Sequence, residues 1–278
     1  MADPPAFAEV AIDVYVLRYP VLDVNATLIV GAEAAVVVDT LSTDAQGAEL
    51  LAAVRTVTAH PLVLVNTHHH FDHCFGNGVL AADNGLGIWA HEAAAALLRE
   101  ELNRLKRQWY DEFFPIKPDL AEAMLAATVA LPDRTVHRES IMDIGGRTVE
   151  LRHLGRGHTD NDLVVLIPDA DVVLAGDLVE QGGPPGFSDS YPLEWPETVA
   201  ELTARMTTGT MVVPGHGAPV DRDFVHAQHG ELTELAWLIR DGHADGAPAE
   251  TVAQKAPFST DVALVAVRRG YAELSGRT

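Results

Sequence analysis

The chain has 278 residues, 47% of them hydrophobic and 21% charged, which is enough for one large globular domain or two fused halves. Its formal net charge of −21 at pH 7 argues against nucleic acids and anionic membranes as partners, because both would repel the chain at long range. The single cysteine, Cys74, excludes a framework of disulfides within the chain and permits a reducing compartment.

The first elements predicted along the chain are strands. Residues 1–20 contain no basic segment followed by an apolar run, so they do not resemble a signal peptide, and a cytoplasmic protein is expected. Residues 11–19 and 25–41 are rich in β-branched side chains, and the second run contains the hairpin signal GAEA. A helix is predicted over 44–59. It precedes the wholly apolar run PLVLV, which is typical of a strand buried on both faces.

A helical insertion interrupts the first half. A last strand that leads into a helix is predicted for LGIWAHEAAAALLREEL, and residues 97–132 predict two helices around PIKP. One face of this segment collects large apolar side chains, namely Leu98, Leu102, Leu105, Trp109 and Phe113. Packing on the core is the commoner meaning of such a stripe, and the alternatives are a lid over a site or a dimer surface.

The second half of the chain repeats the plan of the first. Residues 161–178 contain another hairpin signal, PDAD, and a helix is predicted over 196–206. TMVVPGHG is a second short apolar strand, and a helix over 223–241 follows it. A helical tail over 243–278 ends the chain, and we predict a single domain over residues 1–278.

The internal repeat relates the ends of equivalent strands. It sets Asp39 opposite Asp177, and the histidine-rich turn opposite His216. We expect these strand ends to face each other, and ligands of α/β proteins collect at such ends. Asp39 itself has two open roles, since it could orient a metal-binding imidazole or cap a turn.

The histidine-rich turn, NTHHHFDHCFGN, follows the first buried strand. Side chains alternate in an extended segment, so His68 and His70 point the same way and can share a metal ion, whereas His69 points away. Asp72 and His73 lie where the chain turns, and they can reach a second ion beside the first. The turn therefore predicts half of a metal site, with His69 in a supporting or packing role.

The other half of the site is predicted in three glycine-containing turns at strand ends. They are GRGHTDND with His158, LAGDLV with Asp177 and VPGHGAP with His216. Glycine lets the backbone approach a site closely. Together the candidates are five imidazoles and two carboxylates, a set that suits two divalent metal ions, zinc above all, with iron or manganese as alternatives.

This ordered set of residues resembles that of the metallo-β-lactamase superfamily, over roughly residues 10–240. The resemblance implies an α+β fold, a four-layer αββα sandwich of two similar halves with a dinuclear site at one edge. It implies that one metal is held by His68, His70 and His158, and the other by Asp72, His73 and His216. Asp177 would bridge them, and Asp72 would be the catalytic residue that orients a metal-bridging hydroxide and accepts its proton.

The run HHHFDH and the bridging aspartate are similar to those of glyoxalase II, whereas one subclass of β-lactamases carries a cysteine at the Asp177 position. The C-terminal sequence lacks evident glutathione-binding features. The resemblance therefore implies a dinuclear metallohydrolase of the glyoxalase II-like branch that cleaves a small carbonyl substrate: a thioester, an ester, a lactone or a β-lactam-like amide. The alternative is an iron-dependent oxidoreductase of the persulfide dioxygenase type. A small-molecule substrate is the expected partner, and a homo-oligomer is possible.

Several residues have only a supporting or packing role in this prediction. Residues 179–198 follow Asp177 and contain three aromatic residues that either line a pocket or pack the loop on the body, namely Phe187, Tyr191 and Trp195. Cys74 is expected to pack in the core. The remaining histidines are expected to be structural or exposed: His60, His91, His137, His153, His226, His229 and His243.

Overall fold

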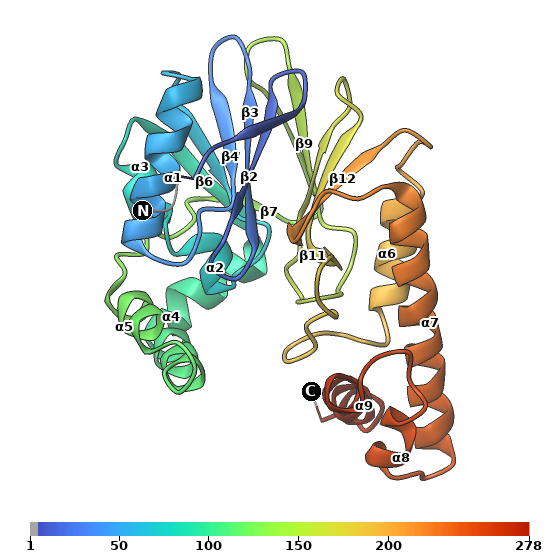
Figure 1. Cartoon of the computed structure of the whole chain (residues 1–278). Helices are drawn as coiled ribbons and strands as arrows, with labels where there is room; N and C mark the ends of the chain where they lie inside the picture. Colours follow the sequence, from blue (N-terminus) through green and yellow to red (C-terminus); the bar gives the residue numbers. More distant parts are fainter. Residues whose placement is uncertain (1–4, 278) are drawn as a thin grey trace.

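Two β-sheet halves packed face to face, with helices on both outer faces, form the centre of the protein (Figure 1). This computed structural model describes residues 5–277. Residues 1–4 and Thr278, the ends of the predicted domain, lie outside the described residues. The predicted α+β fold, a four-layer αββα sandwich, is confirmed.

The first half of the sheet contains seven strands. They are β1 (Ala8–Ala11), β2 (Val14–Tyr19), β3 (Val24–Val30), β4 (Ala35–Val38), β5 (Leu62–Val65), β6 (Gly85–His91) and β7 (Arg134–Val136). Strands β1 to β4 pair antiparallel in chain order, whereas β4 to β7 pair parallel. The wholly apolar β5 lies between β4 and β6, and all four of its residues are buried, as its composition predicts.

The second half contains five strands. They are β8 (Glu139–Asp143), β9 (Thr148–Arg152), β10 (Val164–Ile167), β11 (Val172–Glu180) and β12 (Met211–His216). The hairpin of β10 and β11 precedes the parallel pair of β11 and β12, which repeats the order of β3, β4 and β5. One pairing, between His216 and Val24, joins β12 to β3 and makes the two halves one continuous ladder.

Nine helices are present in the described part of the chain. They are α1 (Asp44–Val57), α2 (Phe71–Cys74), α3 (Asn77–Ala81), α4 (Glu92–Phe113), α5 (Pro118–Ala126), α6 (Trp195–Thr203), α7 (Arg222–Ala244), α8 (Ala249–Ala253) and α9 (Thr260–Leu274). The predicted helices are confirmed as α1, α6 and α7, with ends that differ by a few residues. Within residues 5–277, no helix is both long and apolar enough to cross a membrane.

The core has the periodicity that a sheet with two buried faces requires. In β4, Val36 and Val38 point into the core between the sheet halves, while Ala35 and Val37 pack on the face that α1 covers. On the other side of the sandwich, α6 and α7 cover the outer face of β11 and β12, and α9 packs against the far end of α7 (Figure 1). Burial on both faces therefore holds the strands that carry the candidate ligands in a rigid position.

The insertion predicted over 97–132 contains α4 and α5. Three residues of the predicted stripe, Leu98, Leu105 and Trp109, are buried in one cluster with Phe71 and Phe75 of the histidine-rich turn. Trp109 lies 5.4 Å from Phe71, measured between ring centroids. The insertion therefore packs against the segment that carries four of the candidate ligands, and α4 already begins at Glu92, where the strand β6 ends.

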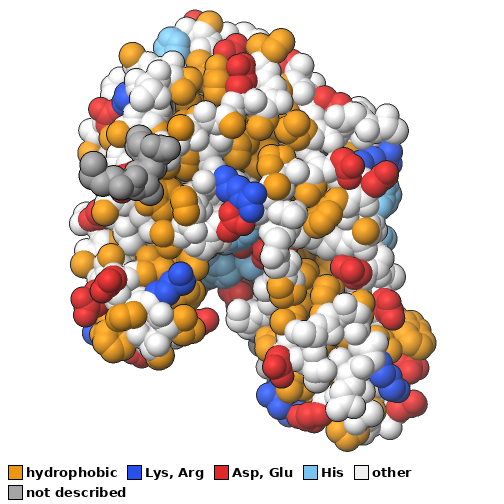
Figure 2. Space-filling model, viewed as in Figure 1, with side chains coloured by type: hydrophobic (Ala, Val, Ile, Leu, Met, Phe, Trp, Pro, Cys, Tyr) orange, Lys and Arg blue, Asp and Glu red, His pale blue; other side chains and the backbone are white. Residues whose placement is uncertain are grey.

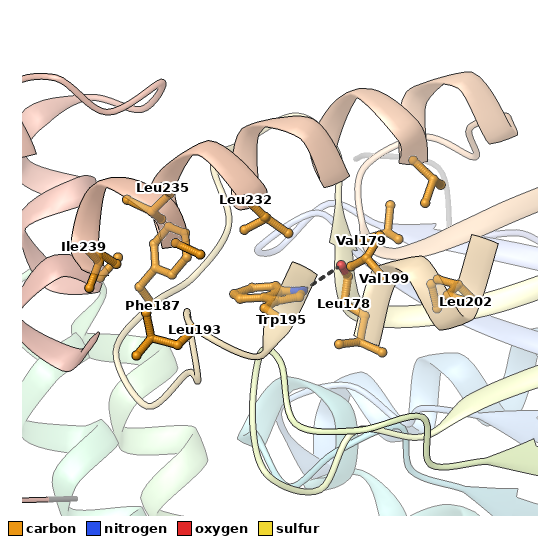
Figure 3. Close-up of a cluster of buried hydrophobic side chains, with 14 of the residues drawn as sticks. Leu178, Val179, Phe187, Leu193, Trp195, Val199, Leu202, Leu232, Leu235 and Ile239 are labelled. Carbon is orange, nitrogen blue, oxygen red and sulfur yellow. Dashed lines mark hydrogen bonds between the residues drawn. The ribbon is translucent and has the colours of Figure 1, made fainter. Parts of the chain in front are cut away.

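The loop after β11 is anchored by two of its three aromatic residues. Trp195 is fully buried between β11, α6 and α7, and its indole N–H donates to the carbonyl of Leu178 at 3.2 Å (Figure 3). Phe187 packs edge-on against Trp195, with 5.4 Å between the ring centroids. Of the two alternatives left open, packing on the body holds for Phe187 and Trp195, whereas Tyr191 lines a cleft.

Candidate metal centre

The seven candidate ligands converge at one edge of the sandwich. His68, His70, Asp72 and His73 come from the turn after β5, His158 from the loop between β9 and β10, Asp177 from β11 and His216 from the end of β12. Their ligand atoms form two adjacent groups. Figure 2 shows histidine side chains, in pale blue, deep in the hollow between two helical lobes.

The first group is a set of three imidazoles. His70 Nδ1 lies 3.0 Å from His68 Nε2 and 3.0 Å from His158 Nε2. Outer hydrogen bonds fix two of these rings, because His68 Nδ1 lies 3.0 Å from Thr67 Oγ1 and His70 Nε2 lies 3.0 Å from Asp189 Oδ2. When the ring nitrogen that points away from the site carries the proton, the other ring nitrogen has a free lone pair. The free lone pairs of His68 Nε2, His70 Nδ1 and His158 Nε2 then face one point, which is the arrangement that a metal ion requires.

The second group contains a carboxylate and two imidazoles. His216 Nε2 lies 3.4 Å from His73 Nε2 and 3.4 Å from Asp72 Oδ2. The outer nitrogen of His73 donates to Asp39 Oδ2 at 2.8 Å, and that of His216 donates to the carbonyl of Leu22 at 2.8 Å. With these outer protons in place, the Nε2 atoms of both rings face the site, where a metal ion would take the place of a second proton.

Asp177 lies between the two groups. Its Oδ2 is 3.4 Å from His158 Nε2 and 3.3 Å from His216 Nε2, and its Oδ1 is 3.3 Å from His73 Nε2. Burial raises the pKa of this carboxyl, but attraction to His73, His216 and the other imidazoles outweighs burial and holds the pKa well below its usual range. Its Oδ1 is buried and accepts no well-formed hydrogen bond from the described residues. The donor set around it fits a divalent metal ion such as zinc, iron or manganese.

The backbone at β12 is shaped around Asp177. A Cβ atom added to Gly215 would overlap Asp177 Oδ1, so only glycine permits this approach of the two strands. The glycine before His216 in the sequence therefore has a steric role: it makes room for the carboxylate between the two groups.

Asp39 orients one of the imidazoles. It is 2% exposed, and it accepts hydrogen bonds from the backbone N–H and the hydroxyl of Thr67, both at 2.8 Å, as well as from His73. Of the two roles left open for Asp39, these hydrogen bonds support the first: Asp39 orients the imidazole of His73.

Replacing Asp39 by asparagine is expected to weaken metal binding at the second group about 10- to 100-fold, the usual effect of losing an outer hydrogen-bond partner. The amide NH₂ of asparagine would donate a hydrogen bond to His73 Nδ1. His73 Nδ1 would then have to be unprotonated, and the ring proton would move to Nε2, the atom that binds the metal. Competition with a chelator measures the affinity. Asp169→Asn, at an exposed pair with Arg147, is the matched control, and an unchanged affinity in folded Asp39→Asn contradicts the role.

Two acidic residues near the site were missed by the sequence analysis. Asp189, in the loop after β11, accepts from His70, and Arg269 of α9 holds this loop by donating to the carbonyls of Asp189 and Ser190 at 3.1 and 2.8 Å. Glu180 ends β11, and its carboxylate lies with Asp177 and His216 in a further group of possible ligands. Burial, and then the charge of Asp177, raise the pKa of Glu180 to about 8.

Cys74 lies beside the site without joining a ligand group. His69 was predicted to point away, and this is wrong: it lines the cleft and forms a further group of possible ligands with His70 and Asp189. His69 is buried next to Asn161, 3.1 Å from its side-chain nitrogen, and burial together with repulsion from His70 lowers the pKa of His69 to about 3. Cys74 is fully buried, and its thiol donates to the carbonyl of His69 at 3.3 Å. The predicted packing role of Cys74 agrees with these contacts. The seven histidines expected to be structural or exposed lie outside every group of possible ligands in residues 5–277.

A cleft of about 620 Å³ opens above the candidate ligands. Helix α4 forms one wall, on which apolar side chains such as Leu105 and Trp109 lie beside the polar Arg104, Gln108 and Glu112. The opposite wall is polar and includes Tyr191 and Arg269, whose guanidinium carbon lies 5.7 Å from the centre of the Tyr191 ring. The cleft has the size and the mixed lining of a site for a small molecule.

A four-layer sandwich with clustered imidazoles and carboxylates at its strand ends defines the metallo-β-lactamase fold class. The family model described as the Metallo-beta-lactamase superfamily matches residues 19–240, and the chain belongs to this superfamily. The chain is 29% identical over 108 residues to a Metallo-beta-lactamase type 2 from Bacillus cereus, a match that covers 35% of this chain and 42% of that protein.

Other relatives match over more of their length. A Metallo-beta-lactamase type 2 from Bacteroides fragilis is 22% identical over 198 residues, 69% of this chain and 68% of that protein. The solved structure of a metallo-beta-lactamase from Pontibacter korlensis superposes with a TM-score of 0.66 at 22% identity, covering 82% of this chain and 99% of that chain. One from Erythrobacter litoralis gives 0.64 at 18% identity, covering 84% and 98%. At these identities the structures establish the fold alone.

Proposed function

We propose that this protein is a hydrolase that uses two divalent metal ions, zinc above all, to cleave a small carbonyl substrate. The observation that carries the proposal is the position of Asp177 between His158 and His216, one from each ligand group, at 3.4 and 3.3 Å. The relatives named as metallo-beta-lactamases support a hydrolase as the class of enzyme.

The metals would supply a water of lowered pKa and polarise the substrate carbonyl. The chain's own residues do the rest. His68, His70 and His158 would hold one ion, and Asp72, His73 and His216 would hold the other. The Asp72 carboxylate would also orient the attacking water and accept its proton. Helix α4 bounds one side of the cleft, and the loop carrying Tyr191 bounds the other.

Within the superfamily, we place the chain in the glyoxalase II-like branch. The carboxylate of Asp177, where one subclass of β-lactamases has a cysteine, supports this branch. The preferred substrates are then thioesters, esters and lactones, with β-lactam-like amides as slower ones. The net charge of −21 supports a small-molecule substrate, with neither nucleic acid nor membrane as a partner. A cytoplasmic location and a homo-oligomer stay part of the proposal.

A substrate panel on zinc-loaded protein tests the proposal. The panel contains a glutathione thioester, an acyl-homoserine lactone, a cephalosporin and an aryl phosphodiester, and hydrolysis of at least one of the first three is the expected result. Because all of them would use the same ligands, His68→Ala should abolish the activity, and it serves as the background control.

Two results would overturn the proposal. Activity confined to the phosphodiester would refute a carbonyl substrate. A single bound iron with oxygen consumption in the presence of a persulfide would favour the iron-dependent oxidoreductase instead.

A further inference from the structure

Glu180 is an acidic residue at the metal centre that the ligand pattern of the sequence does not include. It is the last residue of β11 and pairs with His216 of the neighbouring strand β12. Its backbone N–H donates to the side-chain oxygen of Gln228 at 3.0 Å, and the Gln228 amide donates to the carbonyl of Leu178 at 2.8 Å. The start of the Glu180 side chain is therefore fixed next to the second ligand group.

The Glu180 side chain points into the site. One of its carboxylate oxygens, one oxygen of Asp177 and one ring nitrogen of His216 all lie within 4.8 Å of one another, and all three residues line the cleft. A metal ion with bonds of about 2.0–2.2 Å to oxygen and nitrogen holds ligand atoms up to about 4.4 Å apart, so small side-chain rotations complete the contact.

The side chains around Glu180 offer a divalent ion three ligand atoms. Its carboxylate is partly buried and lies close to the Asp177 carboxylate and the His216 ring. The two arginines of the cleft have other partners, since Arg104 binds Glu101 at 2.7 Å and Arg269 donates to loop carbonyls. Neither arginine therefore competes with a metal ion for these carboxylates.

We propose that Glu180 is an additional ligand of the second metal ion, an inference that rests on the proposed dinuclear function. The two ions then have different surroundings. The first has three imidazoles and the bridging carboxylate. The second would join two groups of possible ligands that share His216, one with Asp72 and His73 and the other with Asp177 and Glu180. Oxygen-rich sites suit harder cations such as Mn²⁺, whereas imidazole-rich sites suit zinc, so the second position should accept manganese beside a zinc ion.

Metal titration tests the proposal without using activity. Metal-free protein receives one equivalent of Zn²⁺ and is then titrated with Mn²⁺, and the free Mn²⁺ is followed by its paramagnetic resonance signal. The wild-type chain should bind one Mn²⁺, and Glu180→Gln should bind it at least about 10-fold more weakly, because a direct ligand matters at least as much as an outer partner. Glu112→Gln, at an exposed position on the α4 wall of the same cleft, is the matched control and should not change the binding.

The outcomes separate this inference from the proposed function. Equal Mn²⁺ binding by wild type and Glu180→Gln would overturn the role of Glu180 and leave the dinuclear hydrolase in place. A wild-type chain that binds only one ion of any kind, zinc included, would overturn both. Circular dichroism shows whether Glu180→Gln is folded, and Glu180→Asp, which keeps the charge on a shorter side chain, should bind Mn²⁺ more tightly than Glu180→Gln.

Discussion

Asp177→Asn is expected to bind no more than one metal ion per chain and to lose most of the hydrolytic activity. Asp177 is the residue within 3.6 Å of four imidazoles, those of His68, His73, His158 and His216. The amide keeps the shape of the side chain but removes its charge, and its N–H₂ group cannot bind a metal. Loss of an outer hydrogen-bond partner of a ligand costs about 10- to 100-fold in metal affinity or activity, so loss of a direct ligand should cost at least as much.

Metal content by mass spectrometry is the primary measurement for Asp177→Asn, and hydrolysis of the best substrate from the panel is the second. Gly215→Ala gives an independent approach to the same contact, because its methyl group would displace Asp177 Oδ1 without changing any charge. We expect both variants to contain less metal per chain than the wild type. A folded Asp177→Asn that retains two ions would show that Asp177 is not the bridge.

The strands and helices that carry the ligands could be predicted because local rules decide them. The apolar run of β5 is buried on both faces and leads into the turn that carries His68 and His70. The chain bends at residues 67–69, so strand alternation does not continue there, and His69 lines the cleft beside His70. The internal repeat placed His216 opposite the histidine-rich turn, and the two do meet across the site, where His73 and His216 lie 3.4 Å apart.

The residues that the sequence did not reveal depend on irregular structure. Strand alternation puts Glu180 on the face opposite Asp177, but the pairing of β11 with β12 shifts between Gly176 and Glu180 and turns the side chain back into the site. Asp189 reaches His70 only because its loop folds back and Arg269, far along the chain, holds it. The strands β7 to β9 were not predicted. They are three to five residues long and most of their residues are exposed or half-buried, so their apolar pattern is weak.

Trp195→Ala is expected to destabilise the folded chain by about 3–5 kcal/mol, the usual cost of truncating a buried tryptophan. Trp195 is fully buried beside Phe187 and the ring of His158. The lost hydrogen bond of the indole contributes little to this destabilisation, because the carbonyl of Leu178 still accepts a hydrogen bond from Gln228 at 2.8 Å. Most of the loss comes from the cavity that the missing side chain leaves.

Denaturant unfolding of Trp195→Ala should be measured with excess chelator, because bound metal stabilises the folded state by mass action. Trp237→Ala is the matched control: that side chain is 61% exposed, and its removal should change the free energy of unfolding by no more than about 0.5 kcal/mol. The two truncations delete the same atoms. The difference between their losses of unfolding free energy therefore reports the effect of burial, free of any effect of tryptophan on the unfolded chain. A loss below about 1 kcal/mol for Trp195→Ala would mean that α6 and α7 close over the cavity, and the core against His158 would then not be rigid.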